Sequence, residues 1–404
     1  MNGARAGHRS PAQEARALNV LFISPNFPPQ YRLFCCALRE RGATVLGIGD
    51  APLHELDAEL RSVLSEYVQV PDLGRYPDML RAVGYLTWRH GKVDRLDSLN
   101  EHWLPVEALL REDFNVPGMR PGVTERLRRK SCMAEIFRNA GIPAPELEPV
   151  ETPEQVRAFV ARVGLPVVFK PDTSAGAVGA FKVASEAQLQ EALAHRREGY
   201  VVQQFSPGTI TTYDGLTDGR GEVVFDSSLV YGTGIMESLS EAREVAYWTR
   251  RAIPPALAEL GRRTVAAFGL RERFFHIEFF ELADGTFRAL EVNLRPPGGF
   301  TTDMMNWSCD GDVYRLWAAV VCGEQTAGTG LERRYHCAHL GRRKGRPYRA
   351  SHDDLLRALG PGLLAYRELP PPIAEAMGDS VYLVRFADLE RLMEARDLVL
   401  ARAR

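Results

Sequence analysis

The chain has 404 residues, with 50 lysines and arginines against 52 aspartates and glutamates, a formal net charge of −2, and 45% hydrophobic side chains. This composition is ordinary for globular proteins of two to four domains, and it excludes collagen-like, low-complexity and intrinsically disordered classes. The near-neutral balance also lacks the basic excess expected when nucleic acid or an anionic membrane is the main partner. We therefore expect a small-molecule partner, with no nucleic acid and no membrane.

Six cysteines are spread over the chain without any CxxC spacing. So few cysteines in so long a chain indicate no disulfide framework and predict a reduced, cytoplasmic protein. No apolar run approaches the roughly 18 to 20 residues of a membrane-spanning helix. Residues 1–18 lack the apolar stretch of a secretory signal and are expected to form a disordered head.

Residues 19–120 are predicted to form an α/β domain of Rossmann-like character. The first turn, SPNFPPQ, lacks the GxGxxG glycines that bring a pyrophosphate close to the first helix, which disfavours a nicotinamide enzyme. The expected elements are a buried parallel strand at Asn19–Ile23, a helix at 31–41, and short strands at 44–48, 68–70, 93–97 and 114–116.

Residues 121–205 are predicted to form a small lid subdomain with its linker helix. A helix over about 125–140 should end at Gly141, and two capping boxes, at Thr152 and Ser185, should each begin a further helix. Strands are expected on both sides of a loop of small residues that begins at Asp172, and a last strand should close the unit.

Strands dominate again in residues 206–330, which we expect to form a larger catalytic subdomain, and residues 331–404 are expected to add a C-terminal αβ appendage. Two strands, over 273–281 and 286–295, are separated by Ala-Asp-Gly at 283–285, which is typical of a tight hairpin turn.

This hairpin is the most informative feature, because alternation along a strand decides which side chains share a face. One face is expected to carry His276, Glu278, Glu291, Asn293 and Arg295. Two carboxylates and a carboxamide oxygen are hard ligands that suit Mg²⁺, whose coordination substrate phosphates usually complete. The alternative is a solvated polar face held by cross-strand pairs.

Five motifs resemble, in order and spacing, those of the ATP-grasp superfamily, and within it the carboxylate-amine ligases. They are Lys130 ahead of the helix that ends at Gly141, VVFKP at 167–171 with its glycine loop, VVQQF at 201–205, HIEFF at 276–280 and EVNLRPPGG at 291–299. The resemblance covers roughly residues 19–330. It implies a fold of α/β plus α+β type, with a pre-ATP-grasp domain, a small lid and a larger catalytic subdomain.

The resemblance also implies roles for individual residues. ATP would be held by two lysines, by the small-residue loop and by the strand between the subdomains, namely Lys130, Lys170, Ser174, Ala175, Gly176, Gly179, Gln203, Gln204 and Phe205. Mg²⁺ or Mn²⁺ would be held by Glu278, Glu291 and Asn293. Arg295 would meet the acyl phosphate and its carboxylate precursor. His276 would contact the acceptor or deprotonate its amine, and a purely structural histidine is the open alternative.

The chain departs from the family pattern near the nucleotide. Gln203 stands where the family commonly has glutamate, so the contact to the adenine amino group would run through a neutral carboxamide. The usual acidic residue is absent near 209–211, and Asp214 is the candidate to contact the ribose instead. In the first domain, Glu101 follows a strand and is a candidate to line the substrate cleft.

The implied reaction joins a small carboxylate to an amine as an amide or peptide bond and releases ADP and phosphate. The carboxylate must first be activated, because its carbonyl is electron-rich and oxide is a poor leaving group, and transfer of the γ-phosphoryl group makes it an acyl phosphate. Two alternatives stay open, a kinase or ligase with a non-amine acceptor and a non-catalytic nucleotide-binding module. Whether the chain forms a homodimer is also open.

Overall fold

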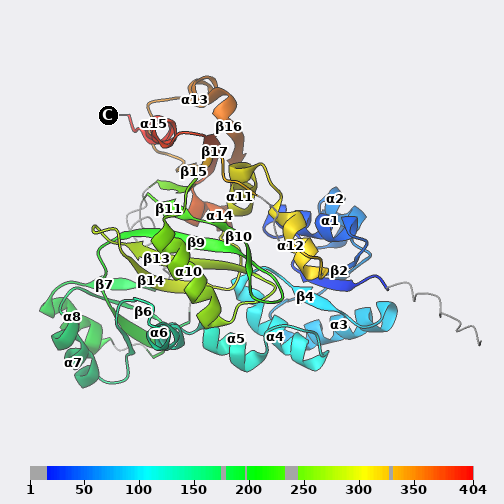
Figure 1. The fold of residues 1–404 in the computed structure, drawn as a ribbon, viewed down its shortest axis with the longest axis horizontal. Coiled ribbons are helices and arrows are strands. Elements are labelled where there is room, and N and C mark those ends of the chain that lie inside the picture. The colour runs from blue at the N-terminus through cyan, green and yellow to red at the C-terminus, as the bar shows by residue number, and fades with distance from the viewer. Residues whose placement is uncertain (1–15, 174–178, 196–197, 233–243, 327–330, 404) are drawn as a thin grey trace, which may run out of the picture.

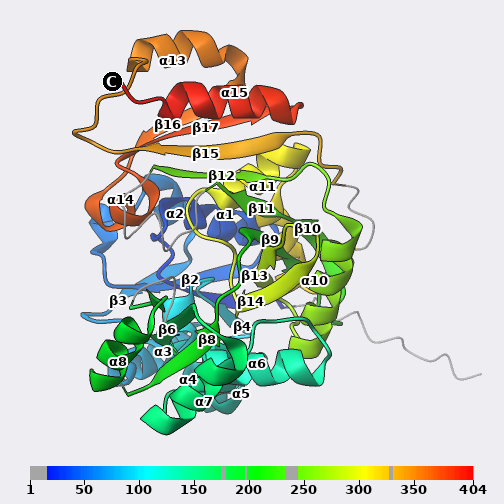
Figure 2. The same cartoon turned by 90° about the vertical axis from the view of Figure 1, so that its left-hand side faces the viewer.

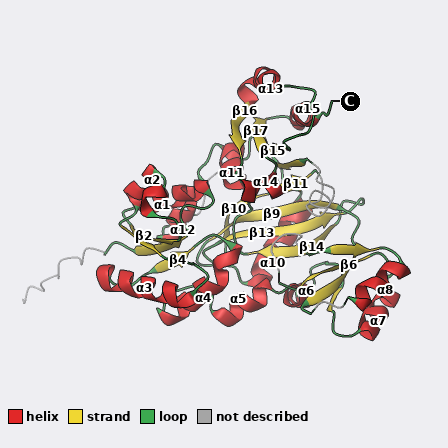
Figure 3. Ribbon diagram, turned by 180° about the vertical axis from the view of Figure 1, so that it is seen from behind, coloured by secondary structure: helices red, strands yellow, loops and turns green. Residues whose placement is uncertain are grey.

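The computed structural model describes residues 16–173, 179–195, 198–232, 244–326 and 331–403. The strands within these ranges form three sheets. Figure 1 shows the N-terminal unit and the module of α7 (Pro153–Val163) and α8 (Glu186–Ala194) at opposite sides of the molecule, with the central sheet between them. Figure 3 shows the same arrangement from behind.

The N-terminal unit is a parallel sheet with strand order β3-β2-β1-β4, so that β4 is an edge strand. β1 is completely buried, as is typical of a parallel sheet whose two faces are covered. The strands are β1 (Asn19–Ile23), β2 (Thr44–Gly49), β3 (Glu66–Gln69) and β4 (Arg95–Asp97). The helices are α1 (Arg32–Glu40), α2 (Ala58–Val63), α3 (Tyr76–His90) and α4 (Leu104–Asp113), with 3-10 turns at Pro29–Tyr31, Leu53–Glu55 and Glu101–Trp103.

The strand expected at 114–116 is wrong. α4 ends at Asp113, and Asn115 takes a left-handed conformation with a φ of 48°. The backbone N–H of Val116 then donates to the carbonyl of Arg111 at 2.9 Å. This bond closes the end of the helix and leaves the segment in a turn rather than in an extended strand.

The second unit is an antiparallel sheet of order β5-β8-β6-β7, packed against α7 and α8. The first capping box is confirmed, since Thr152 and Gln155 exchange both bonds. At the second, Ser185 caps α8, but the side chain of Gln188 accepts from the N–H of Ala184 instead of closing the box. The strands are β5 (Leu147–Pro149), β6 (Val167–Pro171), β7 (Phe181–Val183) and β8 (Tyr200–Gln204).

The central sheet is antiparallel, and its main path runs β14-β13-β9-β11-β12-β15-β17-β16, with β10 paired to β9. The C-terminal strands therefore continue the central sheet, as Figure 2 shows. Its strands are β9 (Thr209–Thr217), β10 (Val223–Ser227), β11 (Leu229–Tyr231), β12 (Val245–Thr249), β13 (Phe274–Glu281), β14 (Phe287–Asn293), β15 (His336–Arg342), β16 (Leu363–Glu368) and β17 (Ser380–Phe386).

The remaining helices surround these sheets. These helices are α5 (Pro121–Arg128), α6 (Lys130–Asn139), α10 (Pro255–Phe268), α11 (Thr301–Cys309), α12 (Val313–Val321), α13 (His352–Leu359), α14 (Pro371–Met377) and α15 (Leu389–Leu400), with a 3-10 turn at Gly360–Gly362. None of the helices in the described ranges is long and apolar enough to cross a membrane.

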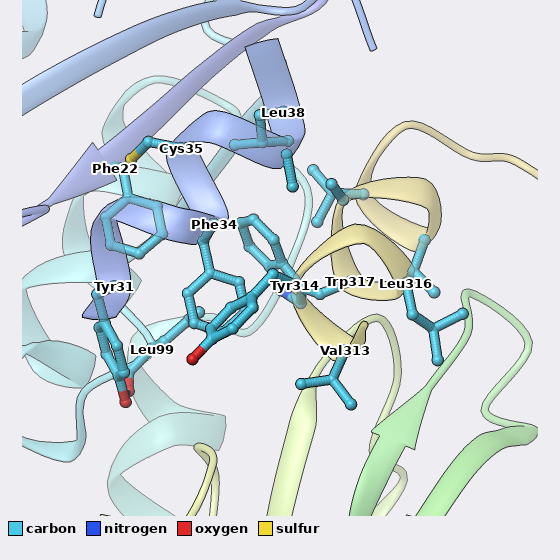
Figure 4. Packing of buried hydrophobic residues seen from close by; sticks show 14 of the residues in the cluster. Phe22, Tyr31, Phe34, Cys35, Leu38, Leu99, Val313, Tyr314, Leu316 and Trp317 are labelled. Carbon is cyan, nitrogen blue, oxygen red and sulfur yellow. The ribbon is translucent and has the colours of Figure 1, made fainter. Parts of the chain in front are cut away.

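An aromatic cluster joins the N-terminal unit to the central sheet (Figure 4). Phe34 of α1 lies at its centre, with ring centroids 4.7 Å from Tyr314 and 5.1 Å from Trp317, both on α12. Phe274, at the start of β13, lies 5.8 Å from the same ring. These rings are buried from water, so hydrophobic burial holds the first unit against the sheet that carries the hairpin.

Candidate active site

The hairpin of β13 and β14 places the predicted polar residues on one face. Its turn has glycine where one is needed, since Gly285 has a φ of 77°. In the register of the two strands, His276 lies opposite Asn293 and Glu278 lies opposite Glu291. The residues that alternate with them are buried in the apolar core. The expectation of a polar face over an apolar one is therefore confirmed.

Arg295 lies just beyond the hairpin, because β14 ends earlier than expected, at Asn293. Its Nη1 donates to the carbonyl of Pro296 at 2.8 Å. Its charge still acts on the polar face. Burial raises the pKa of Glu278, but the hydrogen bond and charge of His276, followed by the charges of Arg295 and a lysine, outweigh burial and lower it.

The two lysines predicted to bind phosphate reach the same face. Lys130 is the first residue of α6, and its Nζ lies 3.2 Å from Oε1 of Glu291. Lys170 lies near the end of β6 and is 7% exposed. Burial lowers the pKa of Lys170 to about 8, an effect that Glu291 opposes and Lys130 reinforces. The tertiary structure thus gathers two lysines and two glutamates from four elements, α6, β6, β13 and β14.

The single helix expected over about 125–140 is wrong, because α5 and α6 are separated at Arg129, whose backbone is extended. This break lets the N–H of Lys130 donate to the carbonyl of Asp172 at 2.9 Å, and Nε of Arg129 to its carboxylate at 2.9 Å. The N–H and hydroxyl of Ser131 donate to the same carboxylate, each at 2.8 Å. Asp172 therefore ties the start of α6 to the end of β6.

Sequence reasoning treated Asp172 only as the first residue of a loop. The sequence does carry a signal for a role of Asp172 in the site, since Asp172 follows Lys170 by two residues and precedes the small-residue loop. Its carboxylate is 8% exposed and accepts from Arg129 and Ser131 at the start of α6. We add it to the site as a positioning residue.

His276 is held at both ring nitrogens. Nδ1 lies 2.6 Å from Oδ1 of Asp214, and Nε2 lies 3.3 Å from Oε1 of Glu278. Burial opposes the positive charge, but Asp214 and Glu278 outweigh it and raise the pKa of His276 to about 9. An imidazolium with both nitrogens engaged is a poor base, which favours the structural interpretation of His276 over the catalytic one.

The expectation that Asp214 contacts the ribose is wrong. Asp214 lies in β9, directly opposite His276 on β13, and is 0% exposed. Its carboxylate bonds His276 and the hydroxyl of Thr212, so it is buried beside His276 and offers no exposed surface to a ribose. A buried aspartate of this kind needs a partner, and the histidine supplies it.

β8 carries the residues predicted to contact adenine. Gln203 is 6% exposed and lies opposite Val168 of β6 in the register. Phe205 follows the strand, and Nζ of Lys182 lies 3.9 Å from the centroid of its ring. Gln204 donates its backbone N–H to the carbonyl of Glu146 at 2.8 Å. The adenine contacts of Gln203, Gln204 and Phe205 stay predictions.

Gly179 lies at the end of the small-residue loop and has a φ of 78°. A Cβ there would lie 2.9 Å from the hydroxyl of Tyr200, which donates to the carbonyl of Gly179 at 3.2 Å. Conformation and close approach both require glycine at this position. Ser174, Ala175 and Gly176 lie outside the described residues, so their phosphate contacts stay predictions.

Glu101 of the N-terminal unit reaches the end of the hairpin. Its Oε2 accepts from the N–H of Leu294 at 3.3 Å, and its Oε1 lies 3.3 Å from Nε of Arg128. Leu294 directly precedes Arg295. The first domain thus borders the end of the hairpin, and the role of Glu101 in lining a substrate cleft stays a prediction.

The hairpin face suits a magnesium ion by its donor chemistry. Glu278 and Glu291 face each other across the strands, and their side chains are 14% and 12% exposed, so both keep some contact with solvent. Among the residues that the structure describes, no three histidine, cysteine, aspartate or glutamate side chains gather to hold a metal by themselves. Two carboxylates with the amide oxygen of Asn293 fit the usual Mg²⁺ arrangement, in which substrate phosphates complete the coordination.

Comparison with curated proteins finds partial matches. No protein-family model matches the chain. It is 28% identical over 166 residues to the carbamoyl phosphate synthase large chain of Mycobacterium sp. (strain JLS), which is 40% of this chain and 14% of that protein. It is 32% identical over 114 residues to the D-alanine–D-alanine ligase of Bordetella avium (strain 197N), which is 27% of this chain and 36% of that protein. The chain therefore spans well under two thirds of the length of these relatives.

Solved structures match over nearly the whole chain. An L-amino acid ligase from Bacillus licheniformis superposes with a TM-score of 0.72 at 18% identity, covering 95% of this chain and 97% of that one. A carboxyaminoimidazole ribonucleotide synthase from Aspergillus clavatus, complexed with ATP, gives 0.68 at 16%, covering 95% and 98%. The biotin carboxylase domain dimer of a Hydrogenobacter thermophilus 2-oxoglutarate carboxylase, complexed with MgADP, gives 0.66 at 14%, covering 94% and 90%. These likenesses establish a shared fold.

Proposed function

We propose that this chain, a member of the ATP-grasp superfamily with the fold of its ligases, is an ATP-dependent ligase. It would activate a small carboxylate as an acyl phosphate and join it to an amine, releasing ADP and phosphate. The observation that carries this proposal is the meeting of Lys130, Lys170, Glu278 and Glu291 at one hairpin face, with Arg295 beside it. Positive groups and carboxylates at such close quarters suit a nucleotide triphosphate and its metal.

In the free protein, the buried pair of Lys130 and Glu291 balances its own charges. On ATP binding, Lys130 would turn from Glu291 to a phosphate oxygen, together with Lys170. Glu278, Glu291 and Asn293 would hold Mg²⁺ or Mn²⁺, which when bound neutralises charge on the phosphoryl oxygens. Each buried charge exchanges one partner for another, so none is left unpaired.

Arg295 would bind the carboxylate substrate and stabilise the oxyanion that forms when the amine attacks the acyl phosphate. Its place directly after Leu294, which Glu101 contacts, puts it between the hairpin and the first domain. Water would hydrolyse an acyl phosphate, so the module of α7 and α8 would close over the site during the reaction.

The partners in this proposal are a small carboxylate and an amine. We also propose a cytoplasmic location, in keeping with six cysteines that are all free. A homodimer is a further proposal, motivated by the dimeric biotin carboxylase domain among the structural relatives.

The experiment is an ADP-release screen over pairs of carboxylates and amines, with hydroxylamine added in a parallel series. Hydroxylamine traps an acyl phosphate as a hydroxamate, so a carboxylate that gives both ADP and hydroxamate is the substrate. We expect at least one carboxylate to give this pair of products, and an amide when the matching amine replaces hydroxylamine.

The alternatives give different products in the same screen. ADP released with a phosphorylated acceptor, and never with a hydroxamate or amide, would identify a kinase or a ligase with another acceptor. ATP binding without ADP release under any condition would identify a non-catalytic nucleotide-binding module.

A further inference from the structure

A cavity lies at the free edge of the N-terminal sheet, outside the polar face of the hairpin. It opens where β4, the start of β13 and α12 come together, and its interior space is about 50 Å³. All three residues of β4 line it, and none of its lining residues is among the candidate active-site residues above. Four arginines contribute to the wall, namely Arg95, Arg111, Arg271 and Arg273.

Residues of this wall carry buried donors that lack a hydrogen-bond partner. Arg111 is 3% exposed, and its Nη2 donates to the carbonyl of Leu96 at 2.5 Å and lies 3.0 Å from a carboxylate oxygen of Glu107. Its Nε and Nη1 have no partner among the described residues. The same holds for Nε of Arg95 and for Nε1 of Trp317, which is 0% exposed. Buried polar groups are normally paired, so four such donors on one wall indicate a missing acceptor.

The charge of the residues around the cavity also favours a negatively charged ligand. Two carboxylates, Asp97 and Glu272, stand against the four arginines. Glu272 lies 3.4 Å from Arg95, and Asp97 lies 3.9 Å from Arg111. Arg273 is 4% exposed and donates through Nε to the carbonyl of Leu294 at 3.3 Å, while Arg271 is exposed at the rim. Glu107, which lies 3.0 Å from Arg111, offsets one more positive charge. The residues around the cavity therefore keep a net positive charge.

We propose that this cavity binds a small dianion, either a phosphate group or a dicarboxylate. Guanidinium N–H groups are strong donors to such oxygens, and Nε and Nη1 of Arg111 have no acceptor among the described residues. The interior of the cavity is small, which suits a compact anion. The site goes beyond the proposed ligase function, because the phosphates of ATP are assigned to Lys130 and Lys170 on the hairpin face.

The test is calorimetric titration of the full chain, free of nucleotide and divalent metal, with inorganic phosphate and separately with succinate. The Lys170→Gln variant is titrated alongside, because the hairpin lysines could also hold an anion. We expect saturable binding of one of the two anions that persists in Lys170→Gln and weakens about tenfold in Arg271→Ala, whose side chain is exposed and unneeded for folding. Arg357→Ala, an exposed arginine on α13, is the matched control and should bind as the wild type does.

Phosphate binding would identify a phosphate-bearing ligand, and succinate binding a dicarboxylate. Binding that vanishes in Lys170→Gln, or that is unchanged in Arg271→Ala, would overturn the proposal. So would the absence of saturable binding for both anions. As a second measurement, crystals soaked in selenate should show an anomalous peak in the cavity beside Nε or Nη1 of Arg111, and a cavity without that peak would refute the site. None of these outcomes depends on ligase activity.

Discussion

Lys130 and Lys170 are two like charges in one buried site, and each depends on the glutamates of the hairpin. Glu291 is subject to opposing influences on its pKa. Burial raises its pKa, the charge of Lys130 lowers it, and that of Glu278 raises it again, leaving it above its usual range. A carboxylate placed so close to a second carboxylate and two lysines is easily recruited by a metal, because a divalent cation relieves the repulsion between the carboxylates.

Replacing Glu291 by glutamine should lower ATP turnover at least about 100-fold, because the side chain keeps its shape but loses the charge that a metal and Lys130 need. Steady-state ADP release measures this, with thermal unfolding to verify that the variant folds. Glu222→Gln, an exposed glutamate before β10, should keep wild-type turnover. Wild-type activity in Glu291→Gln would remove this residue from the site.

The pKa of about 8 for Lys170 predicts a pH dependence. The apparent KM for ATP should rise above pH 8, because the free protein then loses the charge that binds phosphate. In Lys170→Arg, a guanidinium stays charged and the rise should disappear. Kinetics between pH 6.5 and 9.5 decide this, and equal slopes in both proteins would contradict it.

The same group has a defined effect on stability. The pKa of Lys170 is lower in the folded protein than its usual value of 10.5, so unfolding takes up a proton between about pH 8 and 10.5. Its contribution is therefore unfavourable to folding below pH 8 and is relieved as the pH rises toward 10.5.

At the scale of elements, the site depends on the contact between the start of α6 and the end of β6. α6 begins one residue after an extended Arg129, which aims Lys130 at the hairpin, and Asp172 at the end of β6 bonds the first turn of that helix. Neither element places its lysine alone. The contact between them decides the distance between the two positive charges.

Asp172→Ala should therefore raise the KM for ATP about tenfold or more, since small misplacements of binding groups are costly. The unfolding temperature should fall less than it does for a core substitution, because the Arg129 side chain is 48% exposed and water can solvate it once the carboxylate is removed. Asp113→Ala, which removes an exposed acceptor of the Tyr76 hydroxyl, is the control. An unchanged KM in Asp172→Ala would show that the lysines are positioned by other contacts.

At the scale of the whole molecule, the C-terminal residues are part of the central sheet. β15 pairs with β12 on one side and with β17 on the other, and its residues from Cys337 onward are buried. Glu244, just before β12, is bonded by Arg346 and Arg402 from the C-terminal segment. Burial raises the pKa of Glu244, but Arg402, the backbone and Arg346 outweigh it and lower it to about 2.

Removing residues 331–404 should abolish cooperative folding, because it would expose the edge of β12 and the apolar face that the C-terminal strands cover. Size-exclusion chromatography and circular dichroism of the shortened chain measure this. A monodisperse, cooperatively unfolding protein would show instead that these residues form a separate unit.

The sequence by itself determined what local patterns decide. Alternation placed Glu278 and Glu291 on one face, the turn at Gly285 followed from its composition, and the capping box at Thr152 followed from side chains three residues apart. The turn and the capping box depend on neighbours within a few positions, and the shared face depends on a short hairpin between adjacent strands. The ordered motifs added the fold, which the solved structures confirm.

Only the tertiary structure decided which distant side chains meet. Lys130 contacts Glu291, Asp172 bonds Ser131, and Asp214 bonds His276, in each case across a large separation in the chain. The pairing of β12 with β15, and the cavity beside β4, were equally invisible. The physical reason is that burial and long-range pairing set these partners, and a buried charge takes whichever partner the packing brings near.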